Sequence, residues 1–142
     1  MGGGTMVEQF NGILYLIIYI ILFLGSVYYG YQVVFGTSKF IQKYNIDQSG
    51  AFFVRFLGTQ IVAFALIQLY LFFDGIEGHW AFFLFALIQS IIAFVANLIT
   101  VEFSNYKTNN NEKITKEGYI APLGFAILWL VFIYGVQDKI YM

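Results

Sequence analysis

The sequence predicts an all-α membrane protein, a four-helix transmembrane bundle that forms a single domain over residues 1–142. Composition is the first reason: 60% of the residues are hydrophobic and only 11% are charged, whereas about a quarter of the residues in a soluble domain are charged. The second reason is that four apolar runs are long enough to cross a bilayer, which takes about 20 residues. The expected spans cover residues 10–35, 51–73, 80–103 and 119–136.

The two middle spans, 51–73 and 80–103, are joined by a turn that runs only from Asp74 to His79. Consecutive spans with so short a connection must run antiparallel, so we expect them to form a hairpin. In such a hairpin, two residues lie at about the same depth when their numbers add to a constant. The polar residues of one span therefore predict which polar residues of the other lie level with them.

Polar side chains at matching depth form a candidate intramembrane polar seam within this hairpin. The level pairs are Arg55 with Glu102, Gln60 with Asn97, and Gln68 with Gln89. Polar groups inside a bilayer need hydrogen-bond partners, which makes these pairs candidates for contact. Successive residues turn by about 100° around a helix, so one face cannot hold all three pairs and at least one must fail or meet another helix. The alternative is a coincidence of depth, in which Arg55 extends its long side chain to the headgroups.

Small residues at helical spacing predict where the spans pack together. Ser26 and Gly30 form a small-xxx-small pair in the first span. In the third span, small and polar residues recur on one helical stripe that consists of Ala86, Ser90, Ala93, Asn97 and Thr100. Small side chains let two helix backbones approach closely in a membrane. We therefore expect both sets at helix contacts, with Asn97 hydrogen-bonded across its interface.

The other segments fit the same architecture. The first span is long for an untilted crossing, and the tyrosines near its end are typical of an interfacial aromatic belt. The last span has Pro122 in its first turn, where a missing backbone N–H costs nothing. Residues 1–5 are expected to be a flexible leader, and residues 104–118 a solvated loop.

The positive charges predict the orientation of the bundle. Lys39 and Lys43 lie in residues 37–50, three lysines lie in residues 104–118, and the turn between the middle spans has no Lys or Arg. Cytoplasmic loops are enriched in Lys and Arg. We therefore expect residues 37–50 and 104–118 in the cytoplasm and both termini on the non-cytoplasmic side.

The composition argues against catalysis and cofactor binding. The chain has no Cys and only one His, which excludes disulfides, thiolate chemistry and a multi-histidine metal site within one chain. No catalytic motif is present, so we expect no catalytic residue, cofactor or metal. Asp74, Glu77 and His79 lie close together in sequence and are the alternative metal ligands, although solvated turn residues are the simpler interpretation. The net charge of −1 and the scattered lysines give no sign of a nucleic-acid partner.

Two short motifs carry a resemblance to known membrane proteins. Arg-Phe-Leu-Gly opens the second span at residues 55–58, and Gly-Tyr-Ile-Ala-Pro-Leu opens the fourth at residues 118–123. With four short spans, residues 40–136 resemble the DoxX-like small membrane proteins and the ergosterol-biosynthesis scaffold family. The scaffold family typically carries a His and a Glu in its third span, where this chain has Gln89 and Asn97. The resemblance implies a non-catalytic membrane subunit or scaffold and assigns no site residue.

The sequence therefore predicts a non-catalytic accessory or scaffold subunit, packed against membrane lipid and against a protein partner or a second copy of itself. The alternative is an oligomeric channel or facilitator with an amide-lined polar path. In that case the path would be lined by Gln60, Gln68, Gln89 and Asn97. A membrane enzyme ranks third, because the sequence supplies no nucleophile and no acid–base pair.

Overall fold

A computed structural model describes residues 5–142 and confirms the predicted all-α membrane fold. The helices are α1 Met6–Gln9, α2 Ile13–Val34, α3 Thr37–Lys43, α4 Ala51–Asp74, α5 Trp80–Glu102 and α6 Glu117–Ile140. Four of them, α2, α4, α5 and α6, are long and apolar enough to cross a membrane. The chain is thus an integral membrane protein. Of the expected leader, residues 1–4 lie outside the described part of the chain.

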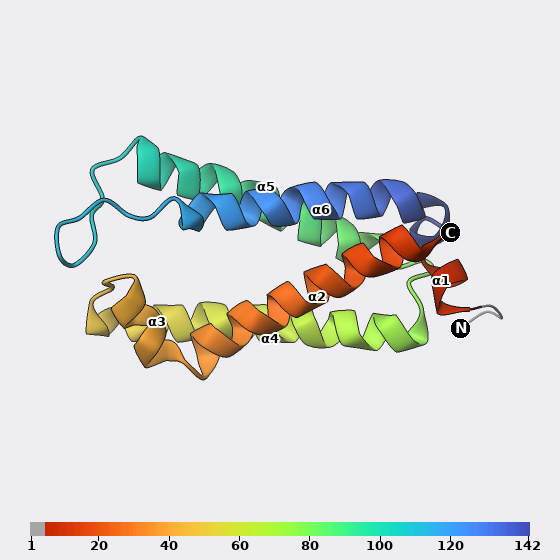
Figure 1. The fold of residues 1–142 in the computed structure, drawn as a ribbon, viewed down its shortest axis with the longest axis horizontal. Helices are drawn as coiled ribbons and strands as arrows, with labels where there is room; N and C mark the ends of the chain where they lie inside the picture. Colours follow the sequence, from red (N-terminus) through yellow and green to blue (C-terminus); the bar gives the residue numbers. More distant parts are fainter. Residues whose placement is uncertain (1–4) are drawn as a thin grey trace.

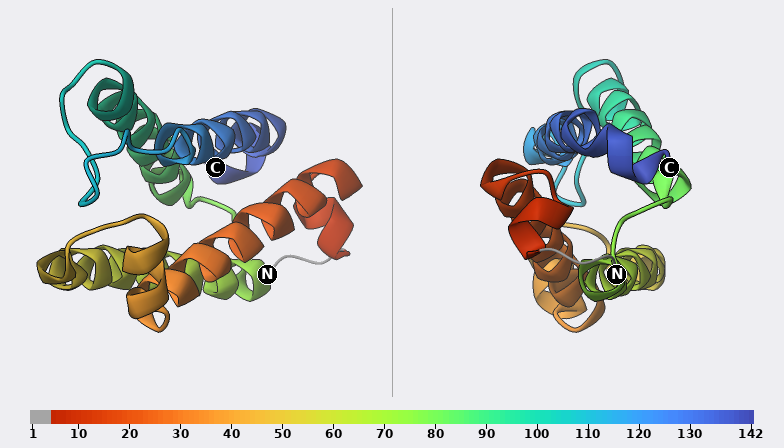
Figure 2. Two further views of the ribbon diagram at one scale, coloured as in Figure 1. Left: turned by 60° about the vertical axis from the view of Figure 1, so that its left-hand side comes forward. Right: turned by 90° about the vertical axis from the view of Figure 1, so that its right-hand side faces the viewer.

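The four long helices are arranged as two pairs (Figure 1). Helix α2 packs against α4, α5 packs against α6, and a smaller contact between α2 and α6 joins the pairs. Helices α4 and α5 do run antiparallel, but the expected hairpin contact between them is wrong, because they have almost no backbone proximity along their length. Their side chains meet where the ring of Phe64, near the middle of α4, stacks on that of Phe82, in the first turn of α5, with centroids 4.8 Å apart. Away from the end with both termini the two pairs separate, which Figure 1 and the left view of Figure 2 show.

The first expected span is divided in two, because its helix does not begin at Phe10. Asn11 and Gly12 have φ angles of 58° and 125°, which end α1 and turn the chain into α2. Asn and Gly adopt this left-handed region most readily. Thr5, at the end of the expected leader, caps α1: its hydroxyl accepts from the backbone N–H of Glu8 at 3.2 Å.

At the end of the molecule with α3, the two segments expected to be loops, residues 37–50 and 104–118, contain regular structure. Helix α3 occupies half of the expected first loop. In the expected loop at residues 104–118, Lys107 and Lys113 form an antiparallel bridge, and the turn between them has Asn111 at a φ of 62°. Helix α6 extends beyond the expected range at both ends, since it runs from Glu117 to Ile140. We call this end of the molecule the loop end, and the opposite end, with both termini and the α4–α5 turn, the turn end (Figure 1).

The core lies at the turn end and is mostly aromatic. All four long helices, α1 and the turn contribute, and the largest fully buried side chains are Tyr19, Phe10, Phe83, Phe132, Leu22, Leu71, Ile76 and Ile140. The Tyr19 ring lies 4.9 Å from that of Phe10 and 5.4 Å from that of Phe132, measured between centroids. Such offset and tilted aromatic pairs add stabilisation beyond that of area burial alone.

Two glycines let α2 cross α6 closely. A Cβ atom at Gly25 of α2 would lie 2.7 Å from the ring of Phe125, and one at Gly135 of α6 would overlap the ring of Tyr15. Each helix thus accepts an aromatic ring of the other where it has no side chain. The contact between the two pairs therefore depends on these two positions.

Candidate functional site

The small-residue stripe of the third span lies at the contact between α5 and α6, which is the largest helix contact in the molecule. Ala86 and Ser90 are buried, and Ala93 is half-buried. The Ser90 hydroxyl donates to the carbonyl of Ala86 within its own helix, at 2.8 Å. The stripe therefore brings two backbones together without an unpaired hydroxyl.

Asn97 completes the hydrogen bonding of α6. Its side-chain Nδ2 donates to the carbonyl oxygen of Gly118 at 2.5 Å. In a regular helix that carbonyl would accept from the backbone N–H four residues later, but residue 122 is proline and has no N–H. Because α6 begins at Glu117, two residues before the expected start, Pro122 is its sixth residue and not part of its first turn. The missing donor thus has a cost, and Asn97 supplies a replacement.

The small pair of the first span lies at the contact between α2 and α4. Ser26 is buried and its hydroxyl donates to the carbonyl of Leu22 at 3.1 Å. A Cβ atom at Gly30 would lie 3.1 Å from Cγ2 of Val62 on α4. One turn closer to the loop end, a Cβ atom at Gly58 of α4 would lie 2.6 Å from Cγ2 of Val34 and 2.7 Å from Cγ1 of Val33 on α2. The small residues of both helices therefore set the spacing of this pair.

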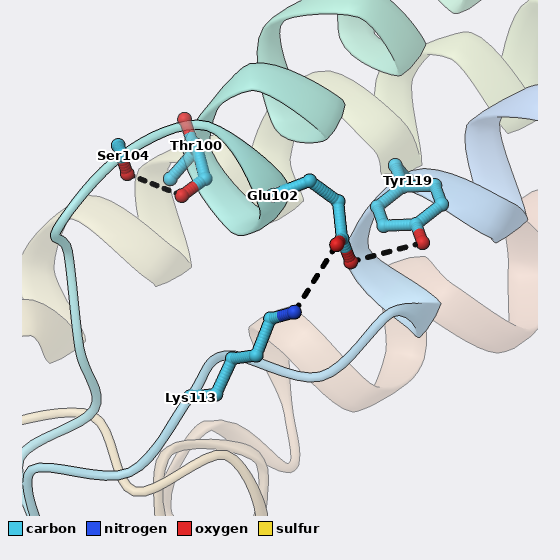
Figure 3. A network of polar contacts seen from close by, with 5 residues as sticks. All are labelled: Thr100, Glu102, Ser104, Lys113 and Tyr119. Carbon is cyan, nitrogen blue, oxygen red and sulfur yellow. Dashed lines mark hydrogen bonds and ion pairs between the residues drawn. The ribbon is translucent and has the colours of Figure 1, made fainter.

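The expected polar seam between the middle spans is not formed. Arg55 donates from Nε to the hydroxyl of Thr37 at 3.2 Å. Glu102 instead accepts from Lys113 at 3.1 Å and from the phenol of Tyr119 at 3.2 Å (Figure 3). The physical reason is the divergence of α4 and α5, since equal depth brings side chains together only when the helices are neighbours.

A carboxylate joins the two helix pairs at the loop end. Glu117, the first residue of α6, accepts from the phenol of Tyr44 at 2.7 Å and from that of Tyr29 at 3.3 Å. Partial burial and this hydrogen bond raise the pKa of Tyr44. A backbone hydrogen bond of 2.8 Å from Asn109 to Asn45 links the two loops. The pairs are therefore held together here by a few polar contacts.

Gln68 is the most deeply buried amide of the seam. Its side chain is fully buried, and neither its amide nitrogen nor its amide oxygen has a hydrogen-bond partner. The buried phenol of Tyr19 donates to its backbone carbonyl at 2.5 Å. The sequence pattern did not single out Tyr19, because it is one of several tyrosines in the first span and the sequence does not indicate which of them is buried.

Gln60 and Gln89 are the two amides of the seam that are exposed. Gln60 lies within three residues of the middle of α4, and Gln89 within two residues of the middle of α5. At about 1.5 Å of rise per residue, each lies within about 4 Å of the centre of its span. The structure gives neither amide a partner among residues 5–142. Both therefore face the surroundings of the protein near the middle of the membrane.

The α4–α5 turn packs against the end of α6. The backbone N–H of Gly78 donates to the carbonyl of Lys139 at 3.0 Å, and the rings of Trp80 and Tyr141 stack. Asp74, Glu77 and His79 do not converge: among the described residues, no three His, Cys, Asp or Glu side chains form a group that could hold a metal ion. The turn is therefore part of the packing of the turn end.

The charges are distributed unevenly between the two ends. Six of the seven cationic residues lie at the loop end: Lys39, Lys43, Arg55, Lys107, Lys113 and Lys116. Four of the eight acidic residues lie at the turn end: Glu8, Asp74, Glu77 and Asp138. The loop end thus has a net charge of +2 and the turn end a net charge of −3.

Comparison with protein-family models, with curated proteins and with solved structures gives no match.

Proposed function

We propose that this chain is a non-catalytic accessory or scaffold subunit that packs against helices of other membrane proteins. The observation that carries this proposal is the exposure of Gln60 and Gln89 near the middle of their spans. Lipid tails offer an amide no hydrogen-bond partner. An exposed amide at that depth favours association with another helix, which can offer one.

The burial of the helices supports the same function. In the most apolar stretch of α5 only 17% of the residues are buried, against 33% for α2. Helix α5 gives α6 a single stripe and leaves its other faces uncovered, and α4 does the same toward α2. These two helices therefore present the faces on which we expect a protein partner.

Purification from native membranes in a mild detergent, followed by intact-complex mass spectrometry, tests this function. A stable complex with a different membrane protein is the expected result. A defined homo-oligomer would instead favour the channel or facilitator. A monomer that carries only lipid, at every detergent concentration that keeps it folded, would contradict the accessory function.

The orientation is a further part of the proposal. The excess of positive charge at the loop end favours a cytoplasmic location for residues 37–50 and 104–118, with both termini on the other side. The chain has no cysteine, so Asn110→Cys and Glu77→Cys each introduce a single thiol. In intact cells, a membrane-impermeant thiol reagent should label Glu77→Cys and leave Asn110→Cys unlabelled. The opposite pattern would reverse the orientation.

A further inference from the structure

We propose that Arg55 binds the phosphate group of a phospholipid from the leaflet at the loop end, with the two Nη nitrogens of its guanidinium as donors. The ligand is a phosphate ester that carries acyl chains. Inorganic phosphate and a carboxylate of another protein are the competing anions. This inference does not depend on the accessory function, because an integral membrane protein of any function is surrounded by phospholipid.

Arg55 and Thr37 lie opposite each other in the regular packing of the α2–α4 pair, which continues into α3 at the loop end (Figure 1). Because the chain segments are antiparallel, the numbers of opposing residues add to the same constant. The opposing positions are Gly30 with Val62, Val34 with Gly58, and Thr37 with Arg55. The hydrogen bond from Arg55 to Thr37 is therefore formed between two positions that the helix packing brings together.

Thr37 fixes the orientation of the guanidinium. The buried Thr37 hydroxyl donates to the carbonyl of Val33 at 2.6 Å, so it is an acceptor for Nε of Arg55, which lies 3.2 Å away. A bond at Nε leaves the N–H donors of both Nη nitrogens for another acceptor, and these have no partner among residues 5–142. Because the side chain of Arg55 is exposed, a ligand from outside the chain can reach them.

The charge of Arg55 is not neutralised within the described part of the chain. Glu102, the carboxylate expected at its depth, pairs with Lys113, and this is the ion pair that residues 5–142 form. A charge that meets neither water nor a counter-charge is costly inside a membrane. An anion from outside the chain is therefore the ligand that this position favours.

The depth of Arg55 matches that of the lipid headgroups. Helix α4 has 24 residues, or about 36 Å at 1.5 Å per residue, whereas the hydrocarbon core is about 30 Å thick. Arg55 is the fifth residue of α4, about 11 Å from its middle. In an upright, centred helix its Cα lies about 4 Å inside the hydrocarbon boundary. A long side chain at that depth reaches the headgroups.

The surface around Arg55 selects a lipid among the possible anions. Phe52, one turn away on the same face of α4, is 73% exposed, and the neighbouring Phe56 is 62% exposed. Acyl chains can lie against these rings, whereas inorganic phosphate gains nothing from them. The planar fork of the guanidinium matches the oxygens of a phosphate group. Phospholipid supplies that group at this depth around the whole protein, whereas a carboxylate would have to be brought there by another protein.

The test is native mass spectrometry of the full chain in a mild detergent, which gives the Kd of the first bound ligand. The probes are dioleoylphosphatidylglycerol, dioleoylglycerol, which has the same acyl chains without a phosphate group, and inorganic phosphate. Arg55→Gln removes the guanidinium, and Arg55→Lys keeps the charge without the fork. Lys107→Gln is the matched control, because it removes an exposed positive charge at the same end.

A further pair of variants tests the orientation of the guanidinium. Thr37→Val removes the acceptor of Nε and leaves Arg55 in place. Thr59→Val is its matched control, because Thr59 is exposed on the same helix as Arg55 and its hydroxyl bonds to its own backbone. The melting temperature of each variant in detergent shows whether it is folded.

We expect the unmodified chain to bind dioleoylphosphatidylglycerol more tightly than dioleoylglycerol, and inorganic phosphate not to compete. Arg55→Gln should weaken phosphatidylglycerol binding about tenfold, as expected for the loss of a charge-assisted bidentate contact, and leave dioleoylglycerol binding unchanged. Arg55→Lys and Thr37→Val should each weaken it about threefold. Lys107→Gln and Thr59→Val should bind as the unmodified chain does.

Several results would overturn the inference. Unchanged phosphatidylglycerol binding in Arg55→Gln would place the lipid elsewhere, and an equal loss in Lys107→Gln would show that only the net charge matters. Competition by inorganic phosphate would make a free anion the ligand. A protein that copurifies with the unmodified chain and is lost from Arg55→Gln would assign the guanidinium to a protein carboxylate. If Arg55→Gln does not fold, unchanged binding in both Arg55→Lys and Thr37→Val would refute the site.

Discussion

The turn end and the loop end of this bundle are held together in different ways. At the turn end, all four long helices meet in one aromatic core, with Phe83 and Phe132 fully buried. At the loop end, the two helix pairs are joined mainly by the phenols of Tyr29 and Tyr44 on Glu117 and by one bond between the loops. Lipid tails are as apolar as the helices, so close packing and hydrogen bonds have to drive association within a membrane. The bundle is therefore a single packed unit at the turn end and two separate helix pairs at the loop end.

The largest expected effect is the removal of an aromatic ring at the turn end. Phe132→Ala should lower the free energy of unfolding by about 3–5 kcal/mol, because the fully buried ring contacts Tyr19, Phe83 and Trp129. Thermal unfolding in detergent measures this. Tyr134→Ala, which truncates an exposed ring on the same helix, is the control and should change little. Similar losses for both would show that the turn end is not the core.

The next effect concerns the replacement hydrogen bond in α6. Asn97→Leu should cost about 1–3 kcal/mol, because it leaves the Gly118 carbonyl without a donor. In a Pro122→Ala background residue 122 has a backbone N–H again, so the same substitution should cost less. A coupling energy of about 0.5–3 kcal/mol is expected for residues that share one acceptor. Additive effects in this double-mutant cycle would refute the shared carbonyl.

The contact between the two pairs can be loosened at a glycine. Gly135→Ala should cost about 1–3 kcal/mol, because the added methyl group would overlap the ring of Tyr15. Gly124→Ala on the same helix is the matched control, since a Cβ atom there meets nothing within 4 Å. That control should be neutral or slightly stabilising, because alanine is the better helix former. Equal effects of the two substitutions would show that α2 does not approach α6 at Gly135.

At the loop end the expected effects are smaller. Glu117→Ala removes the acceptor of both tyrosines and should lower stability by about 0.5–1.5 kcal/mol. In Glu117→Ala, the distance between spin labels at Ser104→Cys and Thr59→Cys should become longer and its distribution broader, since these positions belong to different helix pairs. The turn end should keep its packing. An unchanged distance distribution would mean that the pairs are joined by other contacts.

The smallest effect is a dependence on alkaline pH. The pKa of Tyr44 is raised by burial and by its bond to Glu117, so the folded protein favours the neutral phenol. The stability from this contact is fully present below the ordinary tyrosine pKa of about 10 and is lost as the pH rises through the higher value of the folded state. Tyr44→Phe should remove this part of the pH dependence of unfolding. If Tyr44→Phe and the unmodified chain had the same pH dependence of unfolding, the contribution of the Tyr44–Glu117 contact would be contradicted.

Much of this architecture could be predicted from composition and periodicity. The apolar runs gave the four long helices to within a few residues, except at the ends of the first and last spans, and the stripe with Ala86 and Ser90 lies at a helix contact. The choice of neighbours could not be predicted, because the short turn after Asp74 fixes the direction of α5 but not its distance from α4. Asn97 was expected to bond across its interface, but its partner depended on where α6 begins relative to Pro122. The break at Asn11 depended on a local left-handed turn within an otherwise apolar segment.

The hydrogen bond from Asn97 to Gly118 also has a consequence for assembly and for evolution. Helix α6 is not self-sufficient in the bilayer, because one of its carbonyls is satisfied only by a side chain of α5. The start of α6 is therefore completed only once α5 is beside it, so α6 is stabilised by the helix that is synthesised before it. Over evolutionary time, proline at position 122 and asparagine at position 97 should be gained and lost together.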